Sequence, residues 1–201
     1  LERFAVDAIY VPDGAQMYPD GFATNVSVAG LTDVLCGAHR AGHFDGVATV
    51  VSKLFLQTSA DFAFFGEKDF QQLQVVRRMA RDLDIPVEVV GCPTIREIDG
   101  LAMSSRNLLL SDKARSRAAT LNEVMEEMAE RLGQGAVISD LRGDAEARLK
   151  AAGFGEIDYL EMRTLETLAL VERASEPARL FAAVWMAGVR LIDNIAVPVA
   201  Q

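Results

Sequence analysis

The sequence predicts an α/β protein: a Rossmann-like nucleotide-binding domain with a parallel sheet, followed by a smaller α+β domain with an antiparallel sheet. Residues 61–90 have the pattern strand, amphipathic helix, strand, which is typical of a right-handed βαβ unit. Glycine and the tripeptide Glu67-Lys68-Asp69 separate the first strand from the helix, where parallel sheets present polar groups to ligands. Residues 157–162, 179–187 and 189–197 look like strands of a second sheet.

The first thirty residues contain two extended candidates. Residues 7–11 read as a short buried strand that Pro12 stops, and residues 24–28 form the second candidate. A strand with no earlier partner is unusual at the start of an α/β domain, and the chain has no initiator methionine. We therefore expect the chain to begin within a longer protein, with its nucleotide-binding domain incomplete at the N-terminus.

The next segments show helix periodicity and then an apolar run. Between residues 45 and 58 the apolar residues follow the spacing of one helix face, and they are Val47, Val50, Val51, Leu54 and Phe55. Residues 61–65 read as a fully buried strand.

A helix over residues 69–84 follows this strand. Asp69 is a natural N-cap, and Gln72 stands at the capping-box position three residues later. The residues expected on its buried face are Leu73, Val76, Ala80 and Leu83. Residues 87–90 form the second strand of the unit.

The pattern changes after Pro93. Residues 96–107 lack periodicity and read as a loop, after which Ser111 caps a long helix that extends to Leu132. A second helix covers residues 140–152, and Ala187-Gly188 predicts a tight turn between the last two strands. We therefore divide the chain into a nucleotide-binding domain, residues 1–94, and a C-terminal lid domain, residues 95–201. Ligands should bind between them.

The composition excludes several classes of protein. The 201 residues have a formal net charge of −9, which argues against a general nucleic-acid binder. No apolar run is long enough to span a membrane, the N-terminus does not resemble a signal peptide, and a cytoplasmic location is expected. Cys36 and Cys92 lack metal-type spacing, so no protein-bound metal site is predicted.

Two segments carry candidate chemistry. Lys68 precedes a helix N-terminus, where its amine and the first backbone amides can bind phosphates. Asp69 either caps the helix or binds a ribose hydroxyl or magnesium, and Gln72 either completes the capping box or binds substrate. About thirty residues later, the loop Ser104-Ser105-Arg106 offers donors for phosphate oxygens, and we expect it to close over a nucleotide. The roles of Arg40 and His43 stay open.

These segments together resemble the pantothenate synthetase, or pantoate–β-alanine ligase, family over essentially the whole chain. The segments that carry the resemblance are Gly42 to Val47 with Val51 to Phe55, Phe65 to Leu73, Asp99 to Asn107, and Arg190 to Asn194. Gly-Glu-Lys-Asp followed by Met-Ser-Ser-Arg-Asn at this spacing is highly specific.

The resemblance implies a reaction in two steps. Pantoate attacks the α-phosphorus of Mg-ATP to give pantoyl adenylate and pyrophosphate, and β-alanine then displaces AMP to give pantothenate. ATP and its Mg²⁺ are thus substrate and accompanying metal, with no permanently bound cofactor, and the resemblance also implies a homodimer.

The resemblance also assigns residues. The ATP-binding residues would be Gly66, Glu67, Lys68, Asp69, Ile95, Met103, Ser104, Ser105 and Arg106. Among them Lys68 and Arg106 would be catalytic through the phosphates, and Ile95 would contact adenine. Gln72 would bind pantoate, with Val47 and Val51 against its apolar side.

The chain departs from the family pattern in one respect. It contains no Pro-Thr-Met-Gly or Asn-Pro-x-Gln-Phe segment and no His-x-Gly-His, and neither His39 nor His43 matches that motif. We therefore expect that this chain alone does not catalyse adenylation. Two alternatives remain open: a different nucleotidyltransferase, and a folded, non-catalytic fragment that serves dimerisation or partial nucleotide binding.

Overall fold

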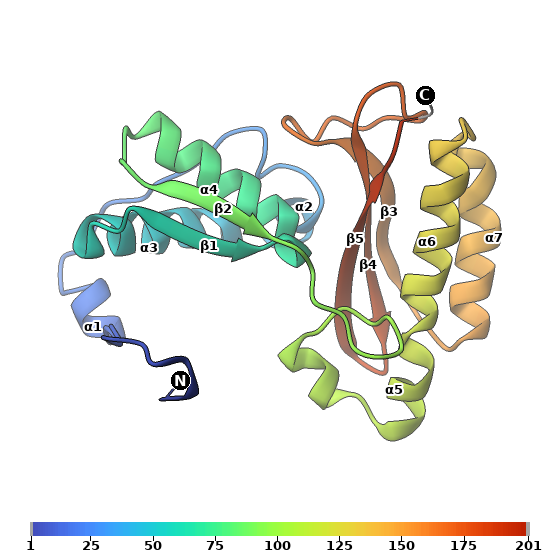
Figure 1. The fold of residues 1–201 in the computed structure, drawn as a ribbon, viewed down its shortest axis with the longest axis horizontal. Coiled ribbons are helices and arrows are strands. Elements are labelled where there is room, and N and C mark those ends of the chain that lie inside the picture. Colours follow the sequence, from blue (N-terminus) through green and yellow to red (C-terminus); the bar gives the residue numbers. More distant parts are fainter. Residues whose placement is uncertain (1, 200–201) are drawn as a thin grey trace.

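The computed structural model describes residues 2–199, which contain two separate sheets (Figure 1). In the first sheet, β1 (Phe62–Gly66) pairs in parallel with β2 (Glu88–Cys92), and α4 (Phe70–Asp82) forms the crossover between them. Helix α3 (His43–Thr58) packs beside α4. The predicted βαβ unit is confirmed.

The second sheet is antiparallel and has the order β3-β4-β5. Its strands are β3 (Ile157–Thr164), β4 (Ala178–Met186) and β5 (Val189–Val197). Ala187 and Gly188 connect β4 to β5 with φ angles of 48° and 79°, the pair of positive φ values that a tight type I′ hairpin turn requires. The predicted fold class, a parallel α/β unit with a C-terminal antiparallel sheet, is confirmed.

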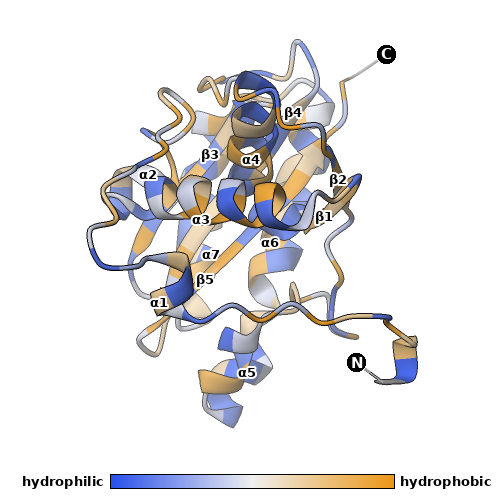
Figure 2. Ribbon diagram, turned by 90° about the vertical axis from the view of Figure 1, so that its left-hand side faces the viewer, coloured by the Kyte–Doolittle hydropathy of each residue, from blue (hydrophilic) through white to orange (hydrophobic). Residues whose placement is uncertain are grey.

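Helices cover one face of the antiparallel sheet. Helices α6 (Thr120–Gly133) and α7 (Ile138–Ala151) lie against it, whereas α5 (Asp112–Ala118) projects from the molecule and carries mostly hydrophilic residues (Figures 1 and 2). The expected single helix from Ser111 to Leu132 is therefore two helices that meet at Ala119, because α6 follows the sheet and α5 leaves it. Ser111 caps α5 as predicted: its side chain accepts a hydrogen bond from the Ala114 amide.

Two hydrophobic cores lie on opposite sides of the antiparallel sheet. The first packs α6 and α7 against β3, β4 and β5, with Leu121, Met125, Met162 and Leu180 almost fully buried. The second packs α3 and α4 with residues from the far part of the chain. These are the strand residues Tyr159, Phe181 and Ala183, and Leu168 from the connection between β3 and β4. The antiparallel sheet is thus shared between both cores. The boundary between residues 94 and 95 stays a prediction.

The N-terminal strands were predicted wrongly. Residues 7–11 form no strand, and the side chains of Ile9, Tyr10 and Val11 are 60%, 56% and 79% exposed. Residues 24–28 form no strand either. No strand in the described part of the chain pairs with either segment, so neither has a ladder of hydrogen bonds to hold it. This region instead contains the short helices η1 (Glu2–Phe4), α1 (Gly14–Met17) and α2 (Cys36–His39).

Three predictions about burial also need correction. Strand β1 is not fully buried: Phe62 and Phe64 are 55% and 69% exposed, because within residues 2–199 helices cover only one face of the parallel sheet. On α3 the valines are only half-buried, and the buried residues are Phe44, Ala48, Thr49, Ser52 and Phe55, since small side chains let α3 approach α4 closely. Leu83 is exposed because it follows the last turn of α4.

A search of the described helices found none that is long and apolar enough to cross a membrane.

Candidate functional site

A cavity of about 170 Å³ lies where the parallel and antiparallel parts of the chain meet. Its walls come from η2 (Glu67–Asp69) and the start of α4, the turn before α3, the segment that leads into η3 (Ser105–Leu109), and strands β3 to β5. A second, more open cavity of about 540 Å³ adjoins it and shares Arg40, Arg106 and Arg190. The predicted position, at the carboxyl end of β1 and between the two parts of the chain, agrees with this location.

Lys68 enters the cavity from η2. Its side chain is only 17% exposed, and the nearest carboxylate oxygen, of Asp69, is 3.9 Å from Nζ. That distance is long for a hydrogen bond, so the ammonium donors remain available to an anion.

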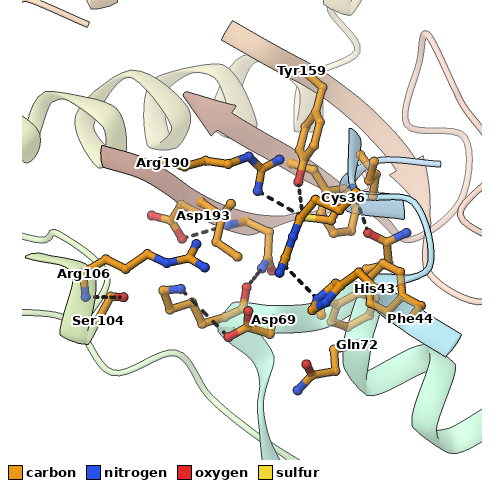
Figure 3. Close-up of a pocket in the computed structure, with 18 of the residues that line it drawn as sticks. Cys36, His43, Phe44, Asp69, Gln72, Ser104, Arg106, Tyr159, Arg190 and Asp193 are labelled. Carbon is orange, nitrogen blue, oxygen red and sulfur yellow. Dashed lines mark hydrogen bonds and ion pairs between the residues drawn. The ribbon is translucent and has the colours of Figure 1, made fainter. Parts of the chain in front are cut away.

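Arg106 enters the cavity from the start of η3, beside Ser104 (Figure 3). Ser104 Oγ accepts a hydrogen bond of 3.2 Å from the Arg106 amide, which caps η3 and shapes this loop. Among the hydrogen bonds of residues 2–199, none involves the Arg106 guanidinium. The structure thus brings Lys68, Ser104, Ser105 and Arg106 to one cavity, although 36 residues of sequence separate Lys68 from Ser104.

The cavity is strongly cationic although the chain is acidic. Four lysine and arginine side chains line it: Arg40, Lys68, Arg106 and Arg190. Its carboxylates are Asp69, which is half exposed, and Asp193, which pairs with Arg96 outside the cavity wall. A concave site with this charge balance favours a polyanion.

His43 faces this group of cations. Arg40 Nη1 lies 2.8 Å from His43 Nε2, so in the neutral imidazole Nε2 accepts this hydrogen bond. Burial, then the charges of Arg40 and Arg106, lower the pKa of His43 below its ordinary value, and they outweigh the opposing effect of Asp69. His43 is therefore a neutral acceptor that orients Arg40 toward the cavity.

A second polar cluster, formed by Arg190, Asp158, Cys36 and Tyr159, lies at the part of the cavity that strands β3 and β5 line. Arg190 donates from Nε to Asp158 over 2.6 Å, and its Nη1 lies 3.4 Å from Cys36 Sγ. Cys36 Sγ is 3.1 Å from the Tyr159 hydroxyl, and burial raises the pKa of Tyr159, so that the phenol stays protonated. Burial acts to raise the pKa of Asp158, but hydrogen bonds from Arg190 and Trp185 hold it below the usual value. The cluster thus contains an Arg190–Asp158 ion pair that the lowered pKa of Asp158 favours.

The N-cap position predicted for Asp69 is confirmed, but the capping hydrogen bonds expected of the Asp69 and Gln72 side chains are not formed among the described residues. Asp69 is the N-cap of α4, with φ −99° and ψ 54°, yet its side chain makes no capping hydrogen bond, because the 3₁₀ turn of η2 directs the chain into the helix. Both side chains line the cavity instead. Gln71, on the neighbouring position, accepts from the Cys36 amide and donates to the carbonyls of Leu31 and Val34, which fixes the loop before α2.

The remaining predicted site residues lie outside the wall of this cavity. Val47 and Val51 pack against the second core, and Glu67 forms an ion pair with Arg179 at 2.8 Å. Ile95 and Met103 are 67% and 54% exposed and adjoin each other through the hydrogen bond from Met103 N to Ile95 O. Gly66 ends β1. Their assignment to ATP or pantoate stays a prediction.

Sequence reasoning missed the contribution of the antiparallel sheet. The cavity residues from this sheet are Tyr159, Phe181, Arg190, Ile192, Asp193 and Asn194. One signal was present: Arg190, Asp193 and Asn194 are polar residues within an otherwise apolar strand. No group of metal-ligating side chains was found among the described residues.

Comparison with known proteins gives one consistent family. A family model described as pantoate-beta-alanine ligase matches residues 1–196. A pantothenate synthetase of Roseobacter denitrificans is 71% identical over all 201 residues and 71% of the relative's length, and one of Ruegeria pomeroyi is 61% identical over 98% of this chain and 69% of its own.

Solved structures agree with the sequence comparisons. A pantothenate synthetase from Thermus thermophilus has 47% sequence identity and a TM-score of 0.91, over 98% of this chain and 72% of that one. A pantoate-beta-alanine ligase from Francisella tularensis, solved as a complex with beta-gamma ATP and beta-alanine, has 28% identity and a TM-score of 0.77, over 96% of this chain and 66% of that one.

Proposed function

The chain belongs to the pantoate–β-alanine ligase family, and from this premise we propose that it serves the ATP-dependent condensation of pantoate with β-alanine. The observation that carries the proposal is the convergence of Lys68, Arg106 and two serines on one cationic cavity. The relative from Francisella tularensis was solved with an ATP compound and beta-alanine, which supports these substrates.

The proposed reaction has two steps. A carboxylate oxygen of pantoate attacks the α-phosphorus of ATP, the bond to the β-phosphate breaks, and pyrophosphate leaves with the electron pair. The amine of β-alanine then attacks the acyl carbon of the adenylate, loses a proton, and releases AMP. In the first step negative charge grows on the departing pyrophosphate, and Lys68 and Arg106 lie where they can stabilise it.

Other features of the proposal concern the substrates. Gln72 would bind pantoate from the wall that α4 contributes, while Ser104 and Ser105 donate to phosphate oxygens. Mg²⁺ would arrive with the nucleotide, because it is usually held by few carboxylates together with substrate phosphates. Asp69 is the cavity carboxylate that would contribute, since Asp193 is tightly paired with Arg96 whereas Asp69 has only the 3.9 Å contact with Lys68. A homodimer and a cytoplasmic location are also part of the proposal and rest on the family resemblance.

Nucleotide binding tests the proposal directly. In calorimetric titration of this chain with ATP, Lys68→Met and Arg106→Met should each weaken binding at least about tenfold, because a hydrogen bond to a charged group contributes about 1.5–3 kcal/mol. The matched control is Lys113→Met, on the exposed surface of α5, which should leave the affinity unchanged. Equal ATP affinity in all four proteins would refute the proposed site.

Catalysis by this chain alone is a separate prediction. The sequence lacks His-x-Gly-His, and in the structure His43 is hydrogen-bonded to Arg40. We expect no AMP release when the 201-residue chain is given ATP, pantoate and β-alanine. Release of AMP that requires pantoate would contradict this expectation and show that these residues suffice for adenylation.

The two rival functions make different predictions. Another nucleotidyltransferase would bind ATP but show no pantoate-dependent exchange of labelled pyrophosphate in the full-length relative. A fragment that serves only dimerisation would fold but show no ATP binding in the calorimetric titration. Binding of ATP that depends on Lys68 and Arg106 favours the ligase over the second rival.

A further inference from the structure

Two adjacent residues of β5, Asp193 and Asn194, are not explained by the proposed reaction. Both line the cavity, and their whole-residue exposures are only 3% and 4%. Polar side chains this deeply buried must be paired, so their partners indicate what they do.

Asn194 holds the turn that carries Lys68. Its Nδ2 donates to the carbonyl oxygens of Glu67 and Lys68, at 2.9 and 2.8 Å. Its Oδ1 accepts a hydrogen bond of 2.6 Å from Arg179, which also pairs with the Glu67 carboxylate. Both amide hydrogens of Asn194 are therefore used within the protein and none is left for a ligand.

Asp193 holds the start of the segment that carries Arg106. Its two carboxylate oxygens accept from Arg96 Nη1 and Nη2 at 2.7 and 3.1 Å, a bidentate ion pair with the aspartate side chain 1% exposed. Arg96 Nη1 also donates to the carbonyl of Gly100. Asp193 thus fixes Arg96, and Arg96 in turn holds the loop at Gly100.

The loop from Arg96 to Arg106 is tied together internally. Asn107 donates from Nδ2 to Glu97 and to the carbonyl of Ala102, at 2.6 and 3.1 Å. Arg115 donates to both Glu97 and Asp99, and its hydrogen bonds hold the pKa of each carboxyl below its usual value. Asn107 and Glu97 join the two ends of the loop, so Arg106, next to Asn107, is connected through Glu97 to the neighbouring Arg96–Asp193 ion pair.

We propose that Asp193 and Asn194 are positioning residues that set the distance between the Lys68 ammonium and the Arg106 guanidinium. The two neighbours on one hydrogen-bonded strand hold the two cation-bearing segments at a fixed spacing. A fixed spacing would let both cations contact one polyphosphate chain at once, and a shift of about 1 Å at such a site can cost a large factor in rate. The inference rests on the proposed function.

The ratio of the affinities for ATP and AMP distinguishes the positioning role of Asp193 and Asn194 from a general loss of folded protein. ATP has the polyphosphate chain that both cations would contact together, whereas AMP has a single phosphate. A change in the spacing of the two cations should weaken ATP binding much more than AMP binding. Partial unfolding, in contrast, reduces the apparent affinity for both nucleotides by the same factor.

The experiment compares Asn194→Ala, Asp193→Ala and Arg96→Lys with the unmodified chain by calorimetric titration. Arg96→Lys retains the charge and is partly exposed, so it folds even if a buried variant does not, but it loses the bidentate pair. Each variant should lower the ATP affinity roughly tenfold and the AMP affinity less than about threefold. The control is Leu149→Ala in α7, which loses stability inside the first core and should lower neither affinity in the folded protein.

The outcomes separate the inference from the proposed function. Equal losses for ATP and AMP in all three variants, or no loss in any, would overturn the positioning role while leaving the ATP site intact. An unmodified chain that binds neither nucleotide would overturn the proposed function, and the inference with it.

Discussion

At the scale of single residues, the candidate site gathers several cations where the rest of the chain provides few counter-charges. The chain has a net charge of −9, but Lys68, Arg106 and Arg40 face the cavity with few carboxylates near them. Burial and the nearby cations lower the pKa of His43. The imidazole stays neutral because protonation would add one more positive charge to a half-buried site.

A depressed histidine pKa makes stability depend on pH in a defined direction. The unfolded chain protonates His43 near its ordinary pKa of 6.5, whereas the folded chain binds that proton only at lower pH. The contribution of His43 to stability is therefore complete above about pH 6.5 and is lost as the pH falls through the folded pKa. Urea unfolding between pH 7 and 5 should show a smaller loss of stability for His43→Gln. His39→Gln is the control, and an unchanged slope in His43→Gln would contradict the assignment.

At the scale of elements, local chemistry decides most helix and turn positions. Ser111 caps α5 as its type predicts, whereas Asp69 occupies the N-cap position of α4 without a capping hydrogen bond, and its side chain lines the cavity. The β4–β5 turn is the clearest case of residual strain. Ala187 adopts φ 48°, a left-handed conformation that asparagine and glycine accept more readily than alanine.

Relief of this strain gives a second prediction. Ala187→Asn should raise the free energy of unfolding by about 0.5 kcal/mol or more, because asparagine tolerates the left-handed region of a type I′ turn. The same change at Ala147, an exposed position inside α7, should instead lower stability by about 0.5 kcal/mol through helix propensity. Thermal or urea unfolding measures both, and a loss of stability in Ala187→Asn would show that the turn is not strained.

At the scale of the whole molecule, the antiparallel sheet joins the two halves of the chain. One of its faces packs on α6 and α7, and the other contributes Phe181 to the core of α3 and α4. Arg179 reinforces the contact: its guanidinium lies 4.2 Å from the centre of the Phe70 ring. The cavity lies at this junction, so its shape depends on both halves staying in place.

Cooperative unfolding follows from the shared core. Leu73→Ala, at a fully buried position of α4, should lower the free energy of unfolding by about 2–5 kcal/mol. Trp185, the single tryptophan, lies in β4, yet its fluorescence transition should shift together with the circular dichroism transition. Leu56→Ala, 66% exposed on α3, should change stability by less than about 0.5 kcal/mol. A tryptophan transition that does not move in Leu73→Ala would show that the halves unfold independently.

The sequence by itself determined the elements whose signals are local: the βαβ unit around Lys68, the helix cap at Ser111 and the hairpin at Ala187-Gly188. It also indicated the segments that carry the family resemblance and that the structure brings to one cavity, because their residue types and spacing are specific. Only the tertiary structure decided that residues 7–11 form no strand, since a strand requires a partner that no local pattern reveals. Likewise, only packing brought Asn194 to Lys68, because 126 residues separate them and their contact exists only once the two sheets meet.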